Sequence, residues 1–205
     1  MALYAIGDTH LSLNSDKSME VFGVGWENYV QRLRDGFAEV NDTDTVVLCG
    51  DLSWGMSLTE AELDFAFLDH ELPGEKWIIK GNHDYWWATA AKMNAFFQEK
   101  GFSHLHILHN SCGLYGDVAL CGTRGWFYEE HGSQKVFNRE LMRLETSLRA
   151  AGEREKLVFL HYPPLYKGYR CPEILALLAQ YGVKTCCYGH LHGPSHRLAI
   201  QGIQE

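Results

Sequence analysis

The sequence predicts a single-domain α/β protein in which helices pack on mixed β-sheets. Short apolar, β-prone runs alternate with helical segments along most of the 205 residues, which favours a layered α/β arrangement. Two strand-like runs, 104–109 and 117–122, follow each other without a helix between them and predict an antiparallel pair. Several of the other runs end in glycine followed by Asp, Asn or His, so we expect polar side chains at one sheet edge.

Apolar periodicity and local stop signals place the individual elements. Strands are predicted over 2–7, 45–49, 76–80, 104–109, 117–122, 157–160, 183–188 and 196–201. Helices are predicted over 26–40, 57–72, 86–100, 134–151 and 172–181. The second helix opens with Ser57 and Glu60, which have the spacing of a capping box. The last begins at Pro172, a residue favoured in the first helical turn.

Composition limits the classes of protein that the chain can belong to. The apolar fraction of 46% and the charged fraction of 21% are typical of a folded domain, which we expect to span residues 1–205. A net charge of −8 argues against a broad nucleic-acid surface, which needs a basic face. A phosphorylated substrate stays compatible with this charge, because bound divalent cations would reverse the local sign.

Cysteine usage and the N-terminal residues predict a cytoplasmic protein. The six cysteines have no C-x-x-C spacing, and Cys49, Cys186 and Cys187 lie in apparently buried strands, so we expect reduced thiols and no zinc site. The N-terminus shows no signal peptide, and no apolar run of about 18 residues predicts a membrane span.

Five short polar stretches follow predicted strands and carry the chemistry. They contain Asp8 and His10; Asp51; Asn82, His83 and Asp84; His161; and His190 and His192. Carboxylate, imidazole and amide oxygen together suit manganese, iron, zinc, cobalt or nickel. This many histidines argue against an all-oxygen magnesium or calcium site. The sequence therefore predicts a metal site with room for more than one ion.

Each stretch alone also has a simpler interpretation. Asp8 and Asn82 follow glycine and are residues that favour turns. His161 suits a hydrogen-bonded core histidine, and the Gly-His-x-His-Gly stretch suits a glycine-rich bend. The metal site would be wrong only if all these separate explanations were true at once, so we favour the metal site.

Taken in order, the five stretches resemble the signature motifs of the calcineurin-like metallophosphoesterase superfamily, in particular its bacterial-type serine/threonine phosphatase-like members. The matching motifs run from Asp8 to His192 and thus cover nearly the whole chain. The resemblance implies a four-layer αββα sandwich with two mixed β-sheets flanked by helices. Family members usually continue with more than one strand after the last motif, whereas twelve residues follow Gly193 here. We therefore expect a truncated C-terminal end and a sheet that lacks an edge strand.

The resemblance also implies a role for each matching residue. Asp8, His10 and His192 would hold one metal ion, Asn82, His161 and His190 a second, and Asp51 would bridge the two. His83 would donate a proton to the leaving alkoxide or stabilise charge on the phosphoryl group, and Asp84 would orient His83 by a hydrogen bond. Two divalent transition metals, manganese first, would activate a bridging hydroxide for attack on a phosphoester.

Residues outside the motifs are expected to choose the substrate. Arg124 follows a strand in a glycine-flanked turn and suits a bidentate phosphate contact, although a surface salt bridge explains it equally well. Aromatic residues beside the motifs suit either pocket walls or core packing: Trp54, Tyr85, Trp86 and Trp87. Specificity is expected in the loops 12–25, 124–135 and 165–171.

Three functions remain open from the sequence. The first is a phosphomonoesterase acting on a phosphorylated small molecule or a phosphoprotein, with neither long nucleic acid nor a membrane as partner. The second is a phosphodiesterase acting on nucleotides or other small diesters. The third is a non-catalytic metal-binding scaffold, which ranks last because His83 and all seven expected ligands are present.

Overall fold

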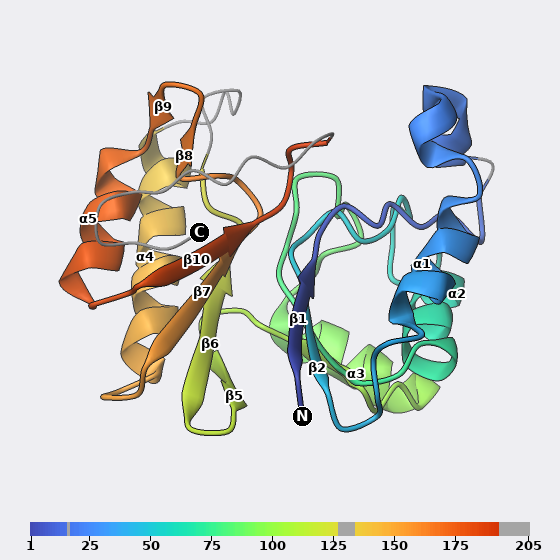
Figure 1. Ribbon diagram of the computed structural model, residues 1–205, viewed down its shortest axis with the longest axis horizontal. Helices are drawn as coiled ribbons and strands as arrows, with labels where there is room; N and C mark the ends of the chain where they lie inside the picture. The colour runs from blue at the N-terminus through green and yellow to red at the C-terminus, as the bar shows by residue number, and fades with distance from the viewer. Residues whose placement is uncertain (16, 127–133, 193–205) are drawn as a thin grey trace.

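Two β-sheets lie face to face between two layers of helices in the computed structural model, which describes residues 1–15, 17–126 and 134–192. Helices α1, α2 and α3 cover one sheet, and α4 and α5 cover the other (Figure 1). This is the four-layer αββα arrangement that the resemblance implies. The predicted strand 196–201 lies outside the described residues.

The first sheet has the order β1-β2-β3-β4. Its strands are β1 (Leu3–Ile6), β2 (Thr45–Leu48), β3 (Glu75–Ile78) and β4 (Leu105–Ile107). All three pairs are parallel, so among the described strands this sheet is purely parallel. Because parallel strands end at the same edge, the residues after β1, β2 and β3 lie together.

The second sheet has the order β10-β7-β6-β5 and is mixed. Its strands are β5 (Cys112–Tyr115), β6 (Val118–Thr123), β7 (Lys156–Leu160) and β10 (Thr185–Tyr188). Strand β5 pairs antiparallel with β6, whereas the other two pairs are parallel.

The predicted pairing of 104–109 with 117–122 is wrong. Strand β4 belongs to the first sheet, and the antiparallel partner of β6 is β5, in residues that the sequence placed in the connection. A pattern of short apolar runs does not say which sheet a strand joins, because that choice depends on packing against the other layers.

The helices are shorter than the apolar periodicity predicts. They are α1 (Tyr29–Phe37), α2 (Glu62–Ala66), α3 (Ala90–Lys100), α4 (Gln134–Ala150) and α5 (Pro172–Gln180). Asn28, with a φ of 51°, separates α1 from a preceding 3₁₀ turn, Val24–Trp26. Thr89 begins α3 because its side chain accepts the N–H of Lys92. Helix α2 continues into a π-helical turn, Phe67–Glu71.

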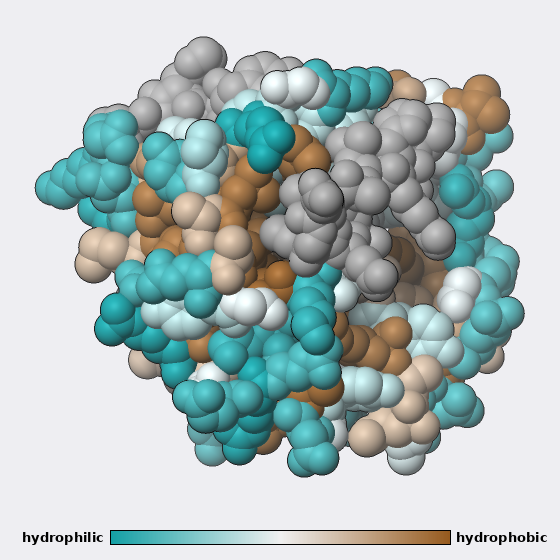
Figure 2. Space-filling view, turned by 60° about the vertical axis from the view of Figure 1, so that its left-hand side comes forward, coloured by the Kyte–Doolittle hydropathy of each residue, from teal (hydrophilic) through white to brown (hydrophobic). Residues whose placement is uncertain are grey.

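Hydrophobic side chains fill the spaces between the layers. A small cluster between the sheets joins residues of both: Val47, Cys49, Ile79, Leu108, Leu120 and Phe159. Two larger clusters fill the helix–sheet interfaces, one for each sheet. The surface in Figure 2 is largely hydrophilic, with hydrophobic residues gathered in its recesses.

Two further expectations concern the chain as a whole. All six cysteines are free thiols, as predicted. Within the described part of the chain, no helix combines the length and hydropathy needed to cross a bilayer.

Candidate metal centre

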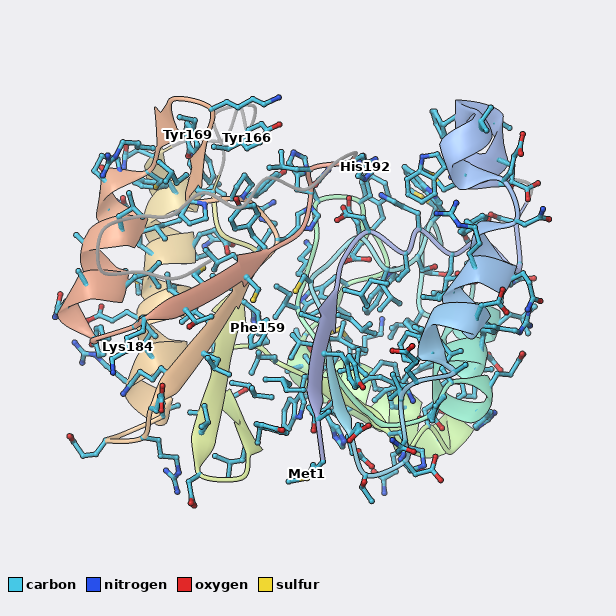
Figure 3. The ribbon with its side chains drawn as sticks, in the orientation of Figure 1. Met1, Phe159, Tyr166, Tyr169, Lys184 and His192 are labelled. Carbon is cyan, nitrogen blue, oxygen red and sulfur yellow. The ribbon has the colours of Figure 1, made fainter. Side chains whose placement is uncertain are left out.

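Seven side chains from both sheets meet at the carboxyl ends of the strands. Asp8, His10 and His192 form one group, and Asp51, His161 and His190 form a second; within each group the candidate ligand atoms lie within 4.8 Å of one another. Asn82 joins the second group, since its Oδ1 lies 2.6 Å from His161 Nε2. Figure 3 places His192 between the two halves of the molecule, at the end opposite Met1.

The carboxylate of Asp51 lies between the two groups. Its Oδ2 is 3.7 Å from Nε2 of His10, and its Oδ1 is 3.6 Å from Nε2 of His161. One oxygen thus faces each group, and the side chain is buried.

The arrangement of lone pairs around His161 fits a bound cation. Its Nδ1 lies 2.9 Å from the carbonyl of Cys49, so Nδ1 carries the hydrogen and donates it. Nε2 then presents a lone pair to Oδ1 of Asn82. A metal ion shared by these atoms satisfies both, and a carbonyl on the far nitrogen is the usual way to orient a metal-bound histidine.

Burial keeps two of the imidazoles in the neutral form that binds metal. It lowers the pKa of His10 to about 3 and that of His161 to about 4. Burial, with the nearby carboxylates of Asp84 and Asp8, raises the pKa of Asp51 to about 8. Negative charge on Asp51 is therefore costly unless a cation lies beside it.

Strained backbone supports the site. Four candidate ligands have positive φ angles, which are rare for residues other than glycine: Asp8 (58°), His10 (44°), Asp51 (52°) and His190 (69°). Such strain concentrates at functional sites, where the surrounding structure holds it in place. The angles aim these side chains inward immediately after their strands.

Two glycines let the turns approach closely enough to bring the groups together. A Cβ at Gly81 would lie 2.1 Å from the backbone nitrogen of Asp51, and one at Gly50 would lie 2.7 Å from Nδ1 of His161. Gly50 also has a φ of +86°. A side chain at either position would push the second group apart.

His83 lies over this centre and is half-buried. Its backbone N–H donates to Oδ1 of Asp51 at 2.7 Å, and its ring lies 5.9 Å from that of His10 between centroids. Burial, together with His190 and His192, lowers the pKa of His83. The ring is thus beside the centre, in a position to meet a bound ligand.

The expected hydrogen bond between Asp84 and the ring of His83 is absent among the described residues. Asp84 accepts the backbone N–H groups of Gly81, Asp51, Leu52 and Ser53 and the indole N–H of Trp86. The Nδ1 atom of His83 instead lies 3.3 Å from the Tyr85 hydroxyl. Asp84 points inward and ties two ligand-bearing loops together, and its buried oxygens are occupied by these donors.

Arg124 lies beside the second group. Its backbone oxygen accepts the N–H groups of His161 and Tyr162. The guanidinium lies 5.8 Å from the ring centroid of Tyr162 and 3.8 Å from the carboxylate of Glu140. The Tyr162 ring in turn contacts that of His190 at 4.7 Å. The residue predicted for substrate binding is thus one side chain away from a candidate ligand.

The aromatic residues near the motifs divide between wall and core. Trp54 stacks on His10 with ring centroids 5.1 Å apart, and Trp86 is buried in the core. The sequence pattern did not predict Trp26 at the centre, because its spacing fitted the apolar face of a helix. Its ring meets His10 and His192 edge-on, at 5.8 and 5.3 Å. No local pattern distinguishes such a tryptophan from a core residue.

Three histidines outside the motifs take no part in the candidate ligand groups: His70, His104 and His106. His104 and His106 both contact Glu75 at the opposite end of the first sheet's strands, and His70 is exposed. His131 and His196 lie outside the described residues.

The fold and the two candidate ligand groups together define a metal-dependent phosphoesterase. The chain belongs to the calcineurin-like phosphoesterase family, whose family model matches residues 1–194. The match covers every candidate ligand, and it confirms the resemblance that the five motifs show.

A solved structure shows the same fold. The chain is similar to a protein of unknown function, AQ665 from Aquifex aeolicus, with a TM-score of 0.50 and 15% sequence identity over 95% of this chain and 81% of that chain. The comparison with curated proteins found no match.

Proposed function

We propose that this protein is a phosphomonoesterase that uses two divalent transition metals, manganese first, with iron, zinc, cobalt or nickel as alternatives. Asp8, His10 and His192 would hold one ion, and Asn82, His161 and His190 the other. Bound there, the ions would supply an activated water and neutralise the phosphoryl oxygens. The free thiols support a reducing compartment, the cytoplasm.

The position of Asp51 carries this proposal. Its two oxygens face different ligand groups at 3.7 and 3.6 Å, which is the arrangement that a carboxylate shared by two ions requires. The carboxylate also accepts the backbone N–H of His83, so the proton donor and the shared ligand are fixed relative to each other.

The chain's own residues complete the reaction. The ester P–O bond breaks as oxygen from water bonds to phosphorus, giving an alcohol and inorganic phosphate. His83 would donate a proton to the leaving alkoxide, since histidine is the commonest proton donor for such a step. The amide nitrogen of Asn82 would bond a phosphoryl oxygen while its Oδ1 binds metal.

Positive charge beside the centre favours the monoester over the diester. Arg124 lies next to the second group. Lys80 lies near Arg124: burial lowers the pKa of Lys80 most, and the positive charge of Arg124 lowers it further. A monoester dianion carries more negative charge than a diester and gains more from these cations. We assign Arg124 to substrate binding on this basis, with a phosphorylated small molecule or phosphoprotein as substrate.

The proposal is tested with an aryl phosphate and the matching bis-aryl diester. Each is assayed with chelator-treated protein and again after manganese is added, while bound metal is measured per chain. We expect manganese to restore hydrolysis and the monoester to react faster.

The other outcomes contradict the proposal in different ways. Faster hydrolysis of the diester would establish the alternative, a phosphodiesterase. No hydrolysis of either compound with two ions bound per chain would favour a non-catalytic scaffold.

A further inference from the structure

A large apolar groove begins at the candidate metal centre and runs between β1 and α1. Its volume is about 860 Å³, within the range of roughly 300–1,000 Å³ that is usual for small-molecule sites. The phosphoryl chemistry described above needs only the polar end of this space, so the groove has room for another part of the substrate.

The groove and the metal centre share residues. Asp8 and His192, from the first ligand group, line the end of the groove. Trp26 also lines it, and its ring contacts that of His192. A phosphate held by the first ligand group could therefore extend its organic group directly along Trp26 into the groove.

Most side chains along the groove are hydrophobic or aromatic, with Arg32 of α1 as a charged exception. Strand β1 contributes Tyr4 and Ile6, and α1 contributes Tyr29, Leu33 and Phe37. Such walls gain from contact with hydrocarbon and offer few partners to a sugar or a charged peptide.

Two glycines leave part of this space open. A Cβ at Gly25 or at Gly36 would meet no atom within 4 Å, and both residues line the groove. Gly36 lies within α1, where glycine is less favourable than alanine by roughly 0.5–1 kcal/mol. The helix thus contains a residue that lowers its stability and widens the groove.

Exposed hydrophobic side chains stand at the rim. Phe22, which lines the groove, is 69% exposed, and its neighbours Val21 and Val24 are 78% and 79% exposed. Phe22 thus extends the apolar lining of the groove to the solvent-exposed surface.

We infer that the natural substrate is a phosphate ester of a hydrophobic alcohol, whose hydrocarbon group lies in the groove while its phosphate lies at the metal centre. This inference rests on the proposed function and deepens it. The groove's continuity with Asp8 and His192 selects a substrate over a partner protein, because an occupant of this end of the groove must meet the ligand group.

The test compares the hydrolysis of ethyl, butyl, hexyl and octyl phosphate by the manganese-loaded protein, at concentrations below micelle formation. We expect KM to fall about threefold to fourfold for each added methylene that the groove buries. The variant Gly36→Leu fills the groove and should flatten this series. The variant Ala38→Leu adds the same side chain to an exposed position outside the groove and should leave the series unchanged.

A second measurement separates the groove from the catalytic proposal. Ethyl and octyl phosphonate, which the protein cannot hydrolyse, are compared by calorimetric binding, with Phe22→Ser as an exposed variant that should keep its fold. We expect octyl phosphonate to bind at least tenfold more tightly than ethyl phosphonate and Phe22→Ser to reduce this ratio.

The outcomes are distinguishable. Chain-length-dependent phosphonate binding without any ester hydrolysis would uphold the groove and overturn the phosphoesterase proposal. Ester hydrolysis with equal KM and equal phosphonate binding for all chain lengths would overturn the groove proposal alone, as would equal effects of Gly36→Leu and Ala38→Leu.

Discussion

At the scale of single residues, the candidate metal ligands differ from His83, the expected proton donor, in how they are held. Four candidate metal ligands are held by strained backbone, whereas His83 is half-buried, and its ring has a hydrogen-bond partner in the Tyr85 hydroxyl at 3.3 Å. A residue that gives up a proton and takes another needs access to solvent, and His83 has that access.

Replacing His83 with alanine should therefore lower kcat strongly and leave metal binding intact. We expect a fall of about 10²–10⁴-fold in kcat on an aryl phosphate, with unchanged metal per chain by atomic absorption. Tyr85→Phe is the matched control: it removes only the hydroxyl beside Nδ1 and should have a much smaller effect. Full activity in His83→Ala would refute the proton-donor role.

At the scale of elements, the loops after β2 and β3 act as one unit. Asp84, from the loop after β3, accepts three backbone N–H groups from the loop after β2, and it also accepts the N–H of Gly81 in its own loop. These contacts place Asp51 and Asn82 on a common support.

Asp84→Asn should consequently weaken both folding and metal binding. The amide keeps the size of the side chain but presents hydrogens to buried N–H donors, so we expect the free energy of unfolding to fall by about 2–3 kcal/mol. Metal per chain should fall as well. Asp64→Asn is the control, since Asp64 is equally buried and binds Ser53 and Leu13 instead. It should lower stability without loss of metal; equal metal loss in both variants would refute the bracing role.

Strand β3 also carries a buried cation far from the centre. Lys76 is fully buried and donates to the carbonyl of Leu72. Burial lowers the pKa of Lys76 to about 8. Between this value and its ordinary pKa of about 10.5, the unfolded chain holds a proton that the folded chain has released.

The free energy of unfolding should therefore rise as pH increases from about 8 to 10.5. The rise due to Lys76 should reach about 3 kcal/mol. Denaturant titrations of the wild type and Lys76→Met across this window measure it as a difference. We expect a smaller rise in Lys76→Met. Parallel pH profiles for the two proteins would contradict the lowered pKa.

At the scale of the whole molecule, function depends on the fit between two sheets. The first sheet supplies Asp8, His10, Asp51 and Asn82 from its strand ends, and the second supplies His161, His190 and His192. Trp77 from β3 reaches across to Gly113 in β5, where a Cβ would lie 2.7 Å from the indole ring. Close packing between these strands thus helps to set the spacing of the two sheets.

Gly113→Ala should disturb this packing. We expect a loss of about 1–3 kcal/mol in the free energy of unfolding, because the added methyl overpacks the space between the sheets. Leu114→Ala, at a half-exposed position of the same strand, should change it by about 0.5 kcal/mol. Chemical denaturation of both variants measures the difference, and equal losses would refute the packing role of Gly113.

Local pattern predicted a layered α/β protein and the location of the centre, whereas the four-layer arrangement was implied by the family resemblance. Apolar runs followed by glycine and a polar residue place Asp8, Asp51 and Asn82 at strand ends whatever the order of the strands. The helix predicted over 86–100 begins at Ala90 in the structure. The prediction included Trp86 because it fits the apolar face of a helix, whereas its indole N–H donates to Asp84. The roles of Asp84 and Trp26 depend on which loops meet in space, and no spacing along the chain encodes that.

The order of the candidate ligands along the chain has a consequence for biosynthesis. Because synthesis is directional and early segments fold first, the first sheet, with Asp8, His10, Asp51 and Asn82, emerges from the ribosome long before His190 and His192. The nascent chain must hold this acidic, strained edge without the imidazoles that complete it. With the proposed ligand set, tight capture of metal requires both halves of the molecule, so we expect metal content to report whether the two halves have come together.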